Sequence, residues 1–360
     1  MGLMNTNNNK NLIEELIKKV VSHPNDTDNY LQLANIYMQE NELDLAISVY
    51  ESLLNIEPEN YIALTNLGSI YFCKYDYIRA INYYSRARNL DVDDFSVYFN
   101  IGNAFAELGE FKEAMSNYIK ALNMEQNNYQ VYSAIGMLYQ DHENYEEAYR
   151  YYEKALKLNN KIAENYINPA LVLMKLRRAE NAIEYFKKAL QLEPANSKII
   201  LYCANAYSAA SDFEKANSSF EEVIKMVPNY YQAYLCYAIS KYDQSKTDDA
   251  IEIYNKAIEI NPNTINAYIL LGNLYFSMHK YEDAAEMYKK VIELQPADSN
   301  VYSLLGNTYV MMKDLRSAIS AYKQAVDIDI ENDELKLIYL EIIQEFIKQK
   351  TSEDTDTNVA

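Results

Sequence analysis

The sequence has few of the residues from which catalytic loops, metal sites and disulfide frameworks are built. Its 360 residues include only seven glycines, three cysteines, three histidines and no tryptophan. Cys73, Cys203 and Cys236 are odd in number and widely spaced, which is typical of a reducing compartment. The three histidines lie in distant segments and do not predict a shared metal ion. We therefore expect no metal and no cofactor. With no signal-peptide core after the polar N-terminus, we expect a cytoplasmic location.

Positive charge is also scarce. The chain has 33 Lys and Arg against 52 Asp and Glu, a formal net charge of −19. A nucleic-acid partner requires a basic surface that displaces counterions, and an anionic membrane attracts the same kind of surface. No run approaches the roughly 18 apolar residues of a membrane span. We therefore expect neither nucleic acid nor a membrane as a partner.

What the sequence does have is a strict 34-residue period. With position 1 set at Thr27, nine repeats run to Asn332 without an insertion or deletion. A period of this length predicts a stacked array of supersecondary units. Position 24 is aromatic in every repeat. Position 20 is alanine throughout, at Ala46, Ala80, Ala114, Ala148, Ala182, Ala216, Ala250, Ala284 and Ala318.

Two apolar stripes within each repeat predict two helices. Positions 4, 7, 8 and 11 share one helical face, as in Tyr98, Ile101, Gly102 and Phe105. Positions 20, 24 and 27 form a second stripe. Position 8 is always Gly or Ala, which allows two helices to cross closely. Position 32 is proline in five repeats, where it ends the second helix.

This use of glycine leaves little from which to build an active site. Five of the seven glycines occupy position 8, and Gly109 lies in a predicted interhelical turn, so no phosphate-binding loop remains. Paired carboxylates such as Glu146 and Glu147 are adjacent on a helix and point about 100° apart, as solvated residues do. No nucleophile, histidine and acid have a plausible common geometry. The sequence predicts that the chain is not an enzyme.

The pattern of Leu at 7, Gly at 8, Tyr at 11, Ala at 20, Tyr at 24, Ala at 27 and Pro at 32 resembles the tetratricopeptide repeat signature. The resemblance covers residues 27–332. It implies an all-α fold, an α-solenoid in which antiparallel helix pairs wind into a right-handed superhelix with a concave groove. It also implies that first-helix positions 2, 5, 6, 9, 12 and 13 line that groove.

The same register predicts the organisation of the ends. Leu16 and Pro24 fall on positions 24 and 32 of an incomplete leading repeat, and an amphipathic helix follows Asn332. The predicted organisation is a disordered N-terminus at 1–10, a partial leading repeat with only its second helix at 11–26, nine repeats at 27–332, a capping helix at 333–350 and an acidic disordered tail at 351–360.

Asparagines mark the predicted groove. An amide has a donor and an acceptor, so a ladder of amides can pair with the backbone of an extended peptide whatever its sequence. The alternative is that these amides bond to a neighbouring helix or to water. The predicted peptide-binding asparagines occupy position 9 or 6 and are Asn35, Asn66, Asn100, Asn103, Asn168, Asn205, Asn273 and Asn307.

The fifth repeat departs from the pattern. Pro169 stands at position 7, inside the predicted first helix, where it removes a backbone hydrogen bond. Lys175 belongs to a local concentration of positive charge, and Lys198 stands at position 2 of the next repeat. Together the two lysines predict a kink with a subsite for an acidic peptide. The alternative is a drifted repeat with a tolerated kink.

These features predict a non-catalytic protein–protein interaction scaffold that binds an extended peptide or a partner helix in its concave groove. Two alternatives stay open. The chain could be the targeting or regulatory subunit of a separate enzyme in a glycosyltransferase-like complex, because the array resembles the repeat half of O-linked N-acetylglucosamine transferases. It could also be a structural array that associates weakly with itself through its end repeats.

Overall fold

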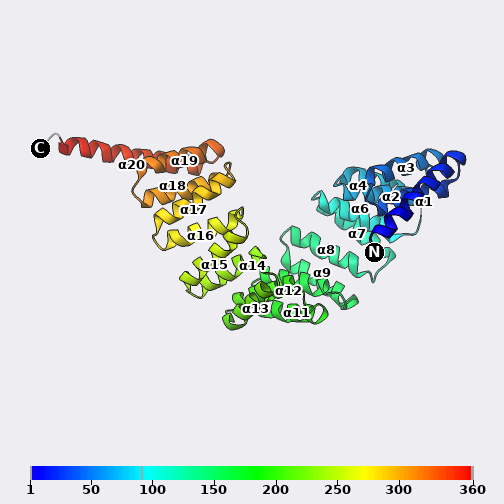
Figure 1. Cartoon of the computed structure of the whole chain (residues 1–360), viewed down its shortest axis with the longest axis horizontal. Helices are drawn as coiled ribbons and strands as arrows, with labels where there is room; N and C mark the ends of the chain where they lie inside the picture. The colour runs from blue at the N-terminus through cyan, green and yellow to red at the C-terminus, as the bar shows by residue number, and fades with distance from the viewer. Residues whose placement is uncertain (1, 91, 358–360) are drawn as a thin grey trace. The chain divides into compact units, whose positions relative to one another are not determined.

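The computed structural model describes residues 2–90 and 92–357, which contain twenty α-helices and no strand. The chain divides into two compact units, Met1–Leu192 and Glu193–Ala360 (Figure 1). The helices of the first unit are α1 (Gly2–Ser22), α2 (Thr27–Gln39), α3 (Leu43–Ile56), α4 (Tyr61–Cys73), α5 (Tyr77–Arg88), α6 (Phe95–Glu107), α7 (Phe111–Met124), α8 (Tyr129–Asp141), α9 (Tyr145–Leu158), α10 (Glu164–Lys175) and α11 (Ala179–Leu192).

The second unit repeats the same arrangement of helix pairs. Its helices are α12 (Ser197–Ala209), α13 (Phe213–Met226), α14 (Tyr231–Asp243), α15 (Thr247–Ile260), α16 (Ile265–Ser277), α17 (Tyr281–Leu294), α18 (Ser299–Met311), α19 (Leu315–Ile328) and α20 (Asp333–Thr357). From α2 to α19 the even-numbered helices occupy positions 1–13 of a repeat and the odd-numbered helices occupy positions 17–30. There are two exceptions: α10 begins one residue late, and α5 ends two residues early. The predicted two-helix repeat is therefore present nine times.

Both ends of the chain are more helical than the sequence predicts. Helix α1 begins at Gly2, inside the segment 1–10 predicted to be disordered, and α20 continues beyond residue 350 to Thr357. Once a helix is nucleated by packing, each added residue costs little free energy. Near the start, Asn9 Nδ2 also donates to Glu40 Oε1 at 2.5 Å. Residues 358–360 of the predicted tail lie outside the described residues.

Each first helix ends in the same left-handed turn. Position 15 has a positive φ in all nine repeats, yet only Gly109, at φ +76°, is a glycine there. The other eight residues have φ between 56° and 62°. The N–H of position 16 then donates to the carbonyl of position 11, as from Glu110 to Phe105 at 2.9 Å. This 6→1 bond defines a Schellman motif, which satisfies carbonyls at the helix end.

The core follows from small residues facing large rings. Ala114 and the other position-20 alanines are fully buried, and Tyr118 at position 24 is 2 % exposed. A Cβ added to Gly102 at position 8 would lie 2.6 Å from the Tyr118 ring. Glycine at this position therefore lets the tyrosine ring lie flat against the backbone of the first helix. Where position 8 is alanine, as at Ala34, the ring accommodates the methyl group.

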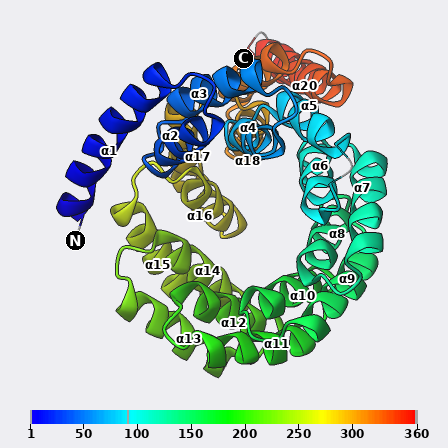
Figure 2. The ribbon, with the colours of Figure 1, turned by 90° about the vertical axis from the view of Figure 1, so that its right-hand side faces the viewer.

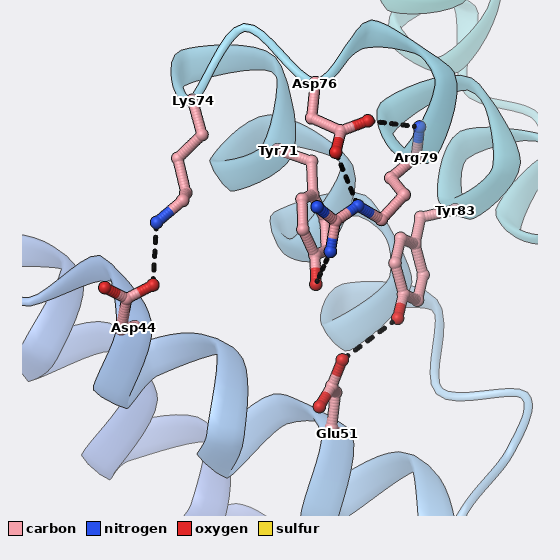
Figure 3. Close-up of polar contacts among 7 residues, drawn as sticks. All are labelled: Asp44, Glu51, Tyr71, Lys74, Asp76, Arg79 and Tyr83. Carbon is pink, nitrogen blue, oxygen red and sulfur yellow. Dashed lines mark hydrogen bonds and ion pairs between the residues drawn. The ribbon is translucent and has the colours of Figure 1, made fainter.

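Polar contacts link neighbouring repeats at their outer helices (Figure 3). Lys74 Nζ, just after α4, donates to Asp44 Oδ1 of α3 at 2.7 Å, and Tyr83 of α5 donates to Glu51 Oε1 of α3 at 3.4 Å. The Arg79 guanidinium lies 4.5 Å from the ring centroid of Tyr71. Such exposed contacts contribute at most about 1 kcal/mol each, so the buried stripes hold the stack together.

Candidate functional site: the inner face of the first helices

In the first unit the even-numbered helices lie on the inner side of its curve. Figure 2 shows α4, α6, α8 and α10 inside and α5, α7, α9 and α11 outside. The predicted groove positions lie on these inner helices, so the predicted site residues of this unit belong to its concave side. The concave side of this unit is therefore the surface on which the contacts of the predicted side chains decide what can bind.

The asparagines at position 9 are tied to the tyrosines of their own repeats. The Tyr118 hydroxyl donates to Asn103 Oδ1 at 2.9 Å. The same bond, from position 24 to position 9, recurs in three other repeats at 2.5, 2.7 and 2.6 Å. These pairs are Tyr50 with Asn35, Tyr288 with Asn273 and Tyr322 with Asn307. The amide oxygen is thus already used inside the repeat.

This bond fixes which way each amide faces. Because the tyrosine hydroxyl donates, the amide oxygen must point toward it and the NH2 group must point away. Among the described residues, the NH2 groups of Asn35, Asn103, Asn273 and Asn307 have no acceptor. The geometry therefore leaves amide donors at half-buried or exposed positions of the first helices, two in each unit.

The other predicted asparagines differ from this pattern. Asn66 Nδ2 donates to the Tyr50 hydroxyl at 2.8 Å, which links repeat 2 to repeat 1. Asn205 faces Phe220 at position 24, which has no hydroxyl, and it is hydrogen-bonded instead to Cys236 of the next repeat. Burial raises the pKa of that thiol, and the bond from Asn205 opposes part of the rise.

Asn100 and Asn168 occupy position 6 of α6 and α10 and are half-buried. Lys175 is exposed at the end of α10, in the first unit. Lys198 is exposed in the first turn of α12, in the second unit, with its Nζ 5.9 Å from the Tyr202 ring centroid. Because the two lysines belong to different units, their joint subsite stays a prediction.

Part of the positive charge of the fifth repeat is neutralised locally. Arg178 pairs with Glu146 at 2.7 Å, and Lys187 pairs with Glu184 at 2.8 Å. Helix α10 contains Pro169 as predicted, and it is buried. The N-terminus of this helix is held by Asn165, whose Nδ2 donates to the Asn159 carbonyl at 2.7 Å.

The inner face of the first unit is hollowed between α6, α8 and the start of α10. We call this space the acidic hollow. It has a volume of about 660 Å³ and is lined mainly by groove positions of α6 and α8, together with Phe72 of α4 and the first residues of α10. Its apolar wall includes Phe99 and Met137. Its carboxylates are Glu107, Asp141 and Glu164.

The sequence-based prediction missed these three carboxylates. Glu107 and Asp141 stand at position 13 and Glu164 at position 2, so the predicted groove positions contained the signal. Asn103 is the one predicted asparagine that lines this hollow.

A smaller hollow of about 210 Å³ lies in the second unit. It is lined by Asn273 together with Ile239, Tyr242, Tyr254, Leu270 and Leu274.

Within the described part of the chain, no group of three or more His, Cys, Asp or Glu residues is placed to hold a metal ion. No disulfide joins the three cysteines, all of which lie in the described residues; Cys203 is buried and Cys73 is exposed. No helix among residues 2–90 and 92–357 is both long enough and apolar enough to cross a membrane.

The fold and its inner face define an all-α solenoid of tandem helix pairs. A family model described as the C-terminal ARM domain of tetratricopeptide repeat protein 21 matches residues 160–345. Three models of the tetratricopeptide repeat match residues 27–60, 102–143 and 129–162. The chain belongs to the tetratricopeptide repeat family, and the predicted fold class is confirmed.

The fold is shared with a solved structure. A tetratricopeptide repeat protein from Parabacteroides merdae is 21% identical with a TM-score of 0.58, over 69% of this chain and 98% of that chain. Yeast Tom70 is 14% identical with a TM-score of 0.49, over 99% and 97%. YrrB, described as having an unusual peptide-binding site, is 24% identical with a TM-score of 0.44, over 51% and 95%. No curated protein sequence matches the chain significantly.

Proposed function

We propose that the chain is a non-catalytic scaffold that binds an extended segment of a partner protein along the inner face of its first helices. The observation that carries this proposal is the common orientation of the amides at position 9, two in each unit. Each tyrosine holds the amide oxygen and leaves the NH2 group without an acceptor. A peptide backbone supplies carbonyl acceptors at regular intervals. NH2 groups repeated along the first helices therefore suit an extended chain.

Asn→Asp substitution separates this function from the structural role of the asparagines. Aspartate at position 9 keeps an acceptor for the tyrosine hydroxyl but has no NH2 group to offer a ligand. We would crosslink partners from native lysate to the wild type and to a variant with Asn35→Asp, Asn103→Asp, Asn273→Asp and Asn307→Asp, and identify them by mass spectrometry. We expect partners of the wild type to be lost from the variant while its helicity and melting temperature stay unchanged.

A matched control adds the same charge to the outer helices. Its changes are made at exposed sites on α7, α13, α15 and α19, namely Ser116→Asp, Ser218→Asp, Asn255→Asp and Gln324→Glu. This control should retain the partners. If the position-9 variant captured the same partners as the wild type, the inner face would not be the binding surface and the proposal would fail.

A further inference from the structure

The acidic hollow restricts the chemistry of a ligand more than the position-9 amides do, because all of its charged residues are negative. It is lined by Glu107, Asp141 and Glu164, and none of its lining residues is Lys, Arg or His. Glu107 accepts a hydrogen bond from the Tyr77 hydroxyl at 3.2 Å. Within the described residues, none of the three carboxylates forms a salt bridge with a lysine or arginine.

The hollow stays open because three groove positions of two neighbouring repeats hold small residues. Position 12 of repeat 3 is Ala106, and positions 5 and 6 of repeat 4 are Ser133 and Ala134. In other repeats position 12 holds residues such as Phe276, and position 6 holds Leu270. The space is therefore a consequence of local sequence and not a gap present at every joint.

An acceptor atom on a largely buried residue also points to a ligand with donors. Asn165 is 6 % exposed and lines the hollow. Its Nδ2 donates to the Asn159 carbonyl, so its Oδ1 must be the free end of the amide. Among the described residues this Oδ1 accepts no hydrogen bond. Among the described residues, Asn117 Oδ1 is the one fully buried side-chain atom without a partner, so Asn165 Oδ1 is accessible to solvent in the hollow, and a bound N–H group would donate to it.

The electrostatics agree with this geometry. Burial raises the pKa of Asp141 above its usual range, the neighbouring Glu107 raises it further, and His142 opposes the rise. Burial and the same two carboxylates raise the pKa of the Tyr118 hydroxyl, which therefore stays neutral. The negative charges thus repel one another across a partly desolvated space, and a cation placed there would relieve the repulsion.

We propose that the acidic hollow binds a lysine or arginine side chain of the partner segment, with a neighbouring apolar side chain packed on Phe72 and Phe99. Ammonium and guanidinium groups supply N–H donors for Asn165 Oδ1 and a positive charge for Asp141 and Glu107. Aromatic rings in the wall add cation–π attraction, which is stronger for a planar guanidinium. This inference rests on the proposed peptide-binding function and names the chemistry of the segment bound.

A displayed library of random nine-residue peptides tests the inference without a known ligand. We would select it on the full-length wild type and on a Glu107→Gln/Asp141→Asn variant. The wild type should enrich peptides with a Lys or Arg next to an apolar residue, and the variant should lose that preference. A control with Glu113→Gln/Glu180→Gln, at exposed sites on the outer helices α7 and α11, should keep it.

An enriched peptide then gives an affinity by fluorescence polarisation. We expect binding about tenfold weaker in the double variant and unchanged in the control. The Ala134→Leu variant should also lose binding by filling the hollow. Two other repeats have leucine at this position 6, as Leu270 and Leu304, so the fold should tolerate the substitution. A Glu107→Lys/Asp141→Lys variant should recover binding to the peptide whose Lys or Arg is replaced by Glu.

The failures are distinguishable. Enrichment of peptides without Lys or Arg, enrichment of acidic peptides, or an unchanged profile in the double variant would overturn this inference and leave the proposed peptide-binding function standing. If no peptide were enriched by the wild type, the inference and the proposed binding of extended segments would both fall.

Discussion

At the scale of single residues, six of the seven tyrosines at position 24 combine a buried ring with a hydrogen-bonded hydroxyl. Where position 9 is polar, the hydroxyl bonds to it, as Tyr84 does with Ser69 at 3.0 Å. In repeat 4, position 9 is Met137, and Tyr152 donates instead to Gln140 at 3.2 Å. The Tyr152 hydroxyl therefore finds a partner on the first helix although position 9 is apolar.

These buried tyrosines predict alkaline destabilisation. Burial raises the pKa of Tyr50 and that of Tyr288 to about 12, from an ordinary value near 10. Below pH 10 both folded and unfolded states are protonated and stability is unaffected. Between pH 10 and 12 the unfolded state ionises first, so stability falls, by up to about 2.7 kcal/mol per tyrosine.

Urea unfolding followed by circular dichroism at pH 8, 10 and 11 checks this expectation. Tyr50→Phe and Tyr288→Phe should each cost about 1 kcal/mol at pH 8, through the lost hydroxyl bond, and should make stability fall less steeply above pH 10. A slope above pH 10 that is the same in wild type and variants would show that these hydroxyls ionise freely in the folded protein.

At the scale of the helix, α10 is the element in which sequence and structure conflict most. Pro169 is buried in its interior, where the ring removes an N–H that would bond to the Asn165 carbonyl. Proline inside a helix costs roughly 3 kcal/mol. Leucine is the usual residue at position 7, as in Leu33 and Leu67.

Pro169→Leu should therefore stabilise the first unit by about 1–3 kcal/mol, because it restores a helical hydrogen bond. Urea unfolding measures the gain, and hydrogen exchange should show greater protection in α10. Pro194→Leu serves as the control, since Pro194 is exposed in the turn after α11 and should give no gain. A loss of stability in Pro169→Leu would mean that the site is shaped around the proline ring.

The helices themselves were largely predictable. The spacing of Ala114, Tyr118 and Gly102 set the two faces, and the helix bounds followed from the period. The left-handed conformation of Tyr75 or Arg177 was not predictable, because neither residue favours positive φ and the Schellman motif imposes it. The extensions of α1 and α20 were missed because composition says little about a helix that propagates from a packed neighbour.

The site was predictable only in part. Position 9 marked the asparagines, but its bond to position 24 depends on how two helices cross. The acidic hollow was missed for two reasons. Its space comes from Ala106 and Ala134 in neighbouring repeats. Its charge comes from Glu107, Asp141 and Glu164, whereas the predicted ligand-binding side chains were amides and lysines. A hollow is a property of the joint between repeats, which no single repeat displays.

At the scale of the whole molecule, an array of repeats needs sealed ends. Helix α20 covers the last repeat by packing Ile342 against Leu315 and Tyr322, with Phe346 at the edge. The outer side of α20 still exposes apolar residues, at Leu337, Leu340 and Ile347. The C-terminal end is thus closed over the core and yet presents apolar surface outward.

Ending the chain at Asn332 should uncover the core of the last repeat. We expect hydrogen exchange in α18 and α19 to accelerate and the apparent mass in analytical ultracentrifugation to rise with concentration, because an apolar end invites stacking. A chain ended at Thr351 should behave as the full chain does. If the chain ended at Asn332 stayed monomeric with unchanged exchange, α20 would not be a cap. Association of the full chain itself would favour the self-assembling alternative.

The left-handed turn at position 15 has a further consequence, which concerns how the protein can change over time. Eight of the nine turns hold a residue other than glycine. Asn41 tolerates this conformation, whereas residues such as Tyr75 and Arg177 disfavour it at a cost of about 1 kcal/mol each. Glycine, already present as Gly109, removes that cost. These turns lie outside both the core stripes and the groove positions. Glycine substitutions there would therefore raise the free energy of unfolding without changing a core or groove residue. Substitution of glycine at individual turns, by evolution or by design, would therefore offset destabilising changes made in the proposed binding surface.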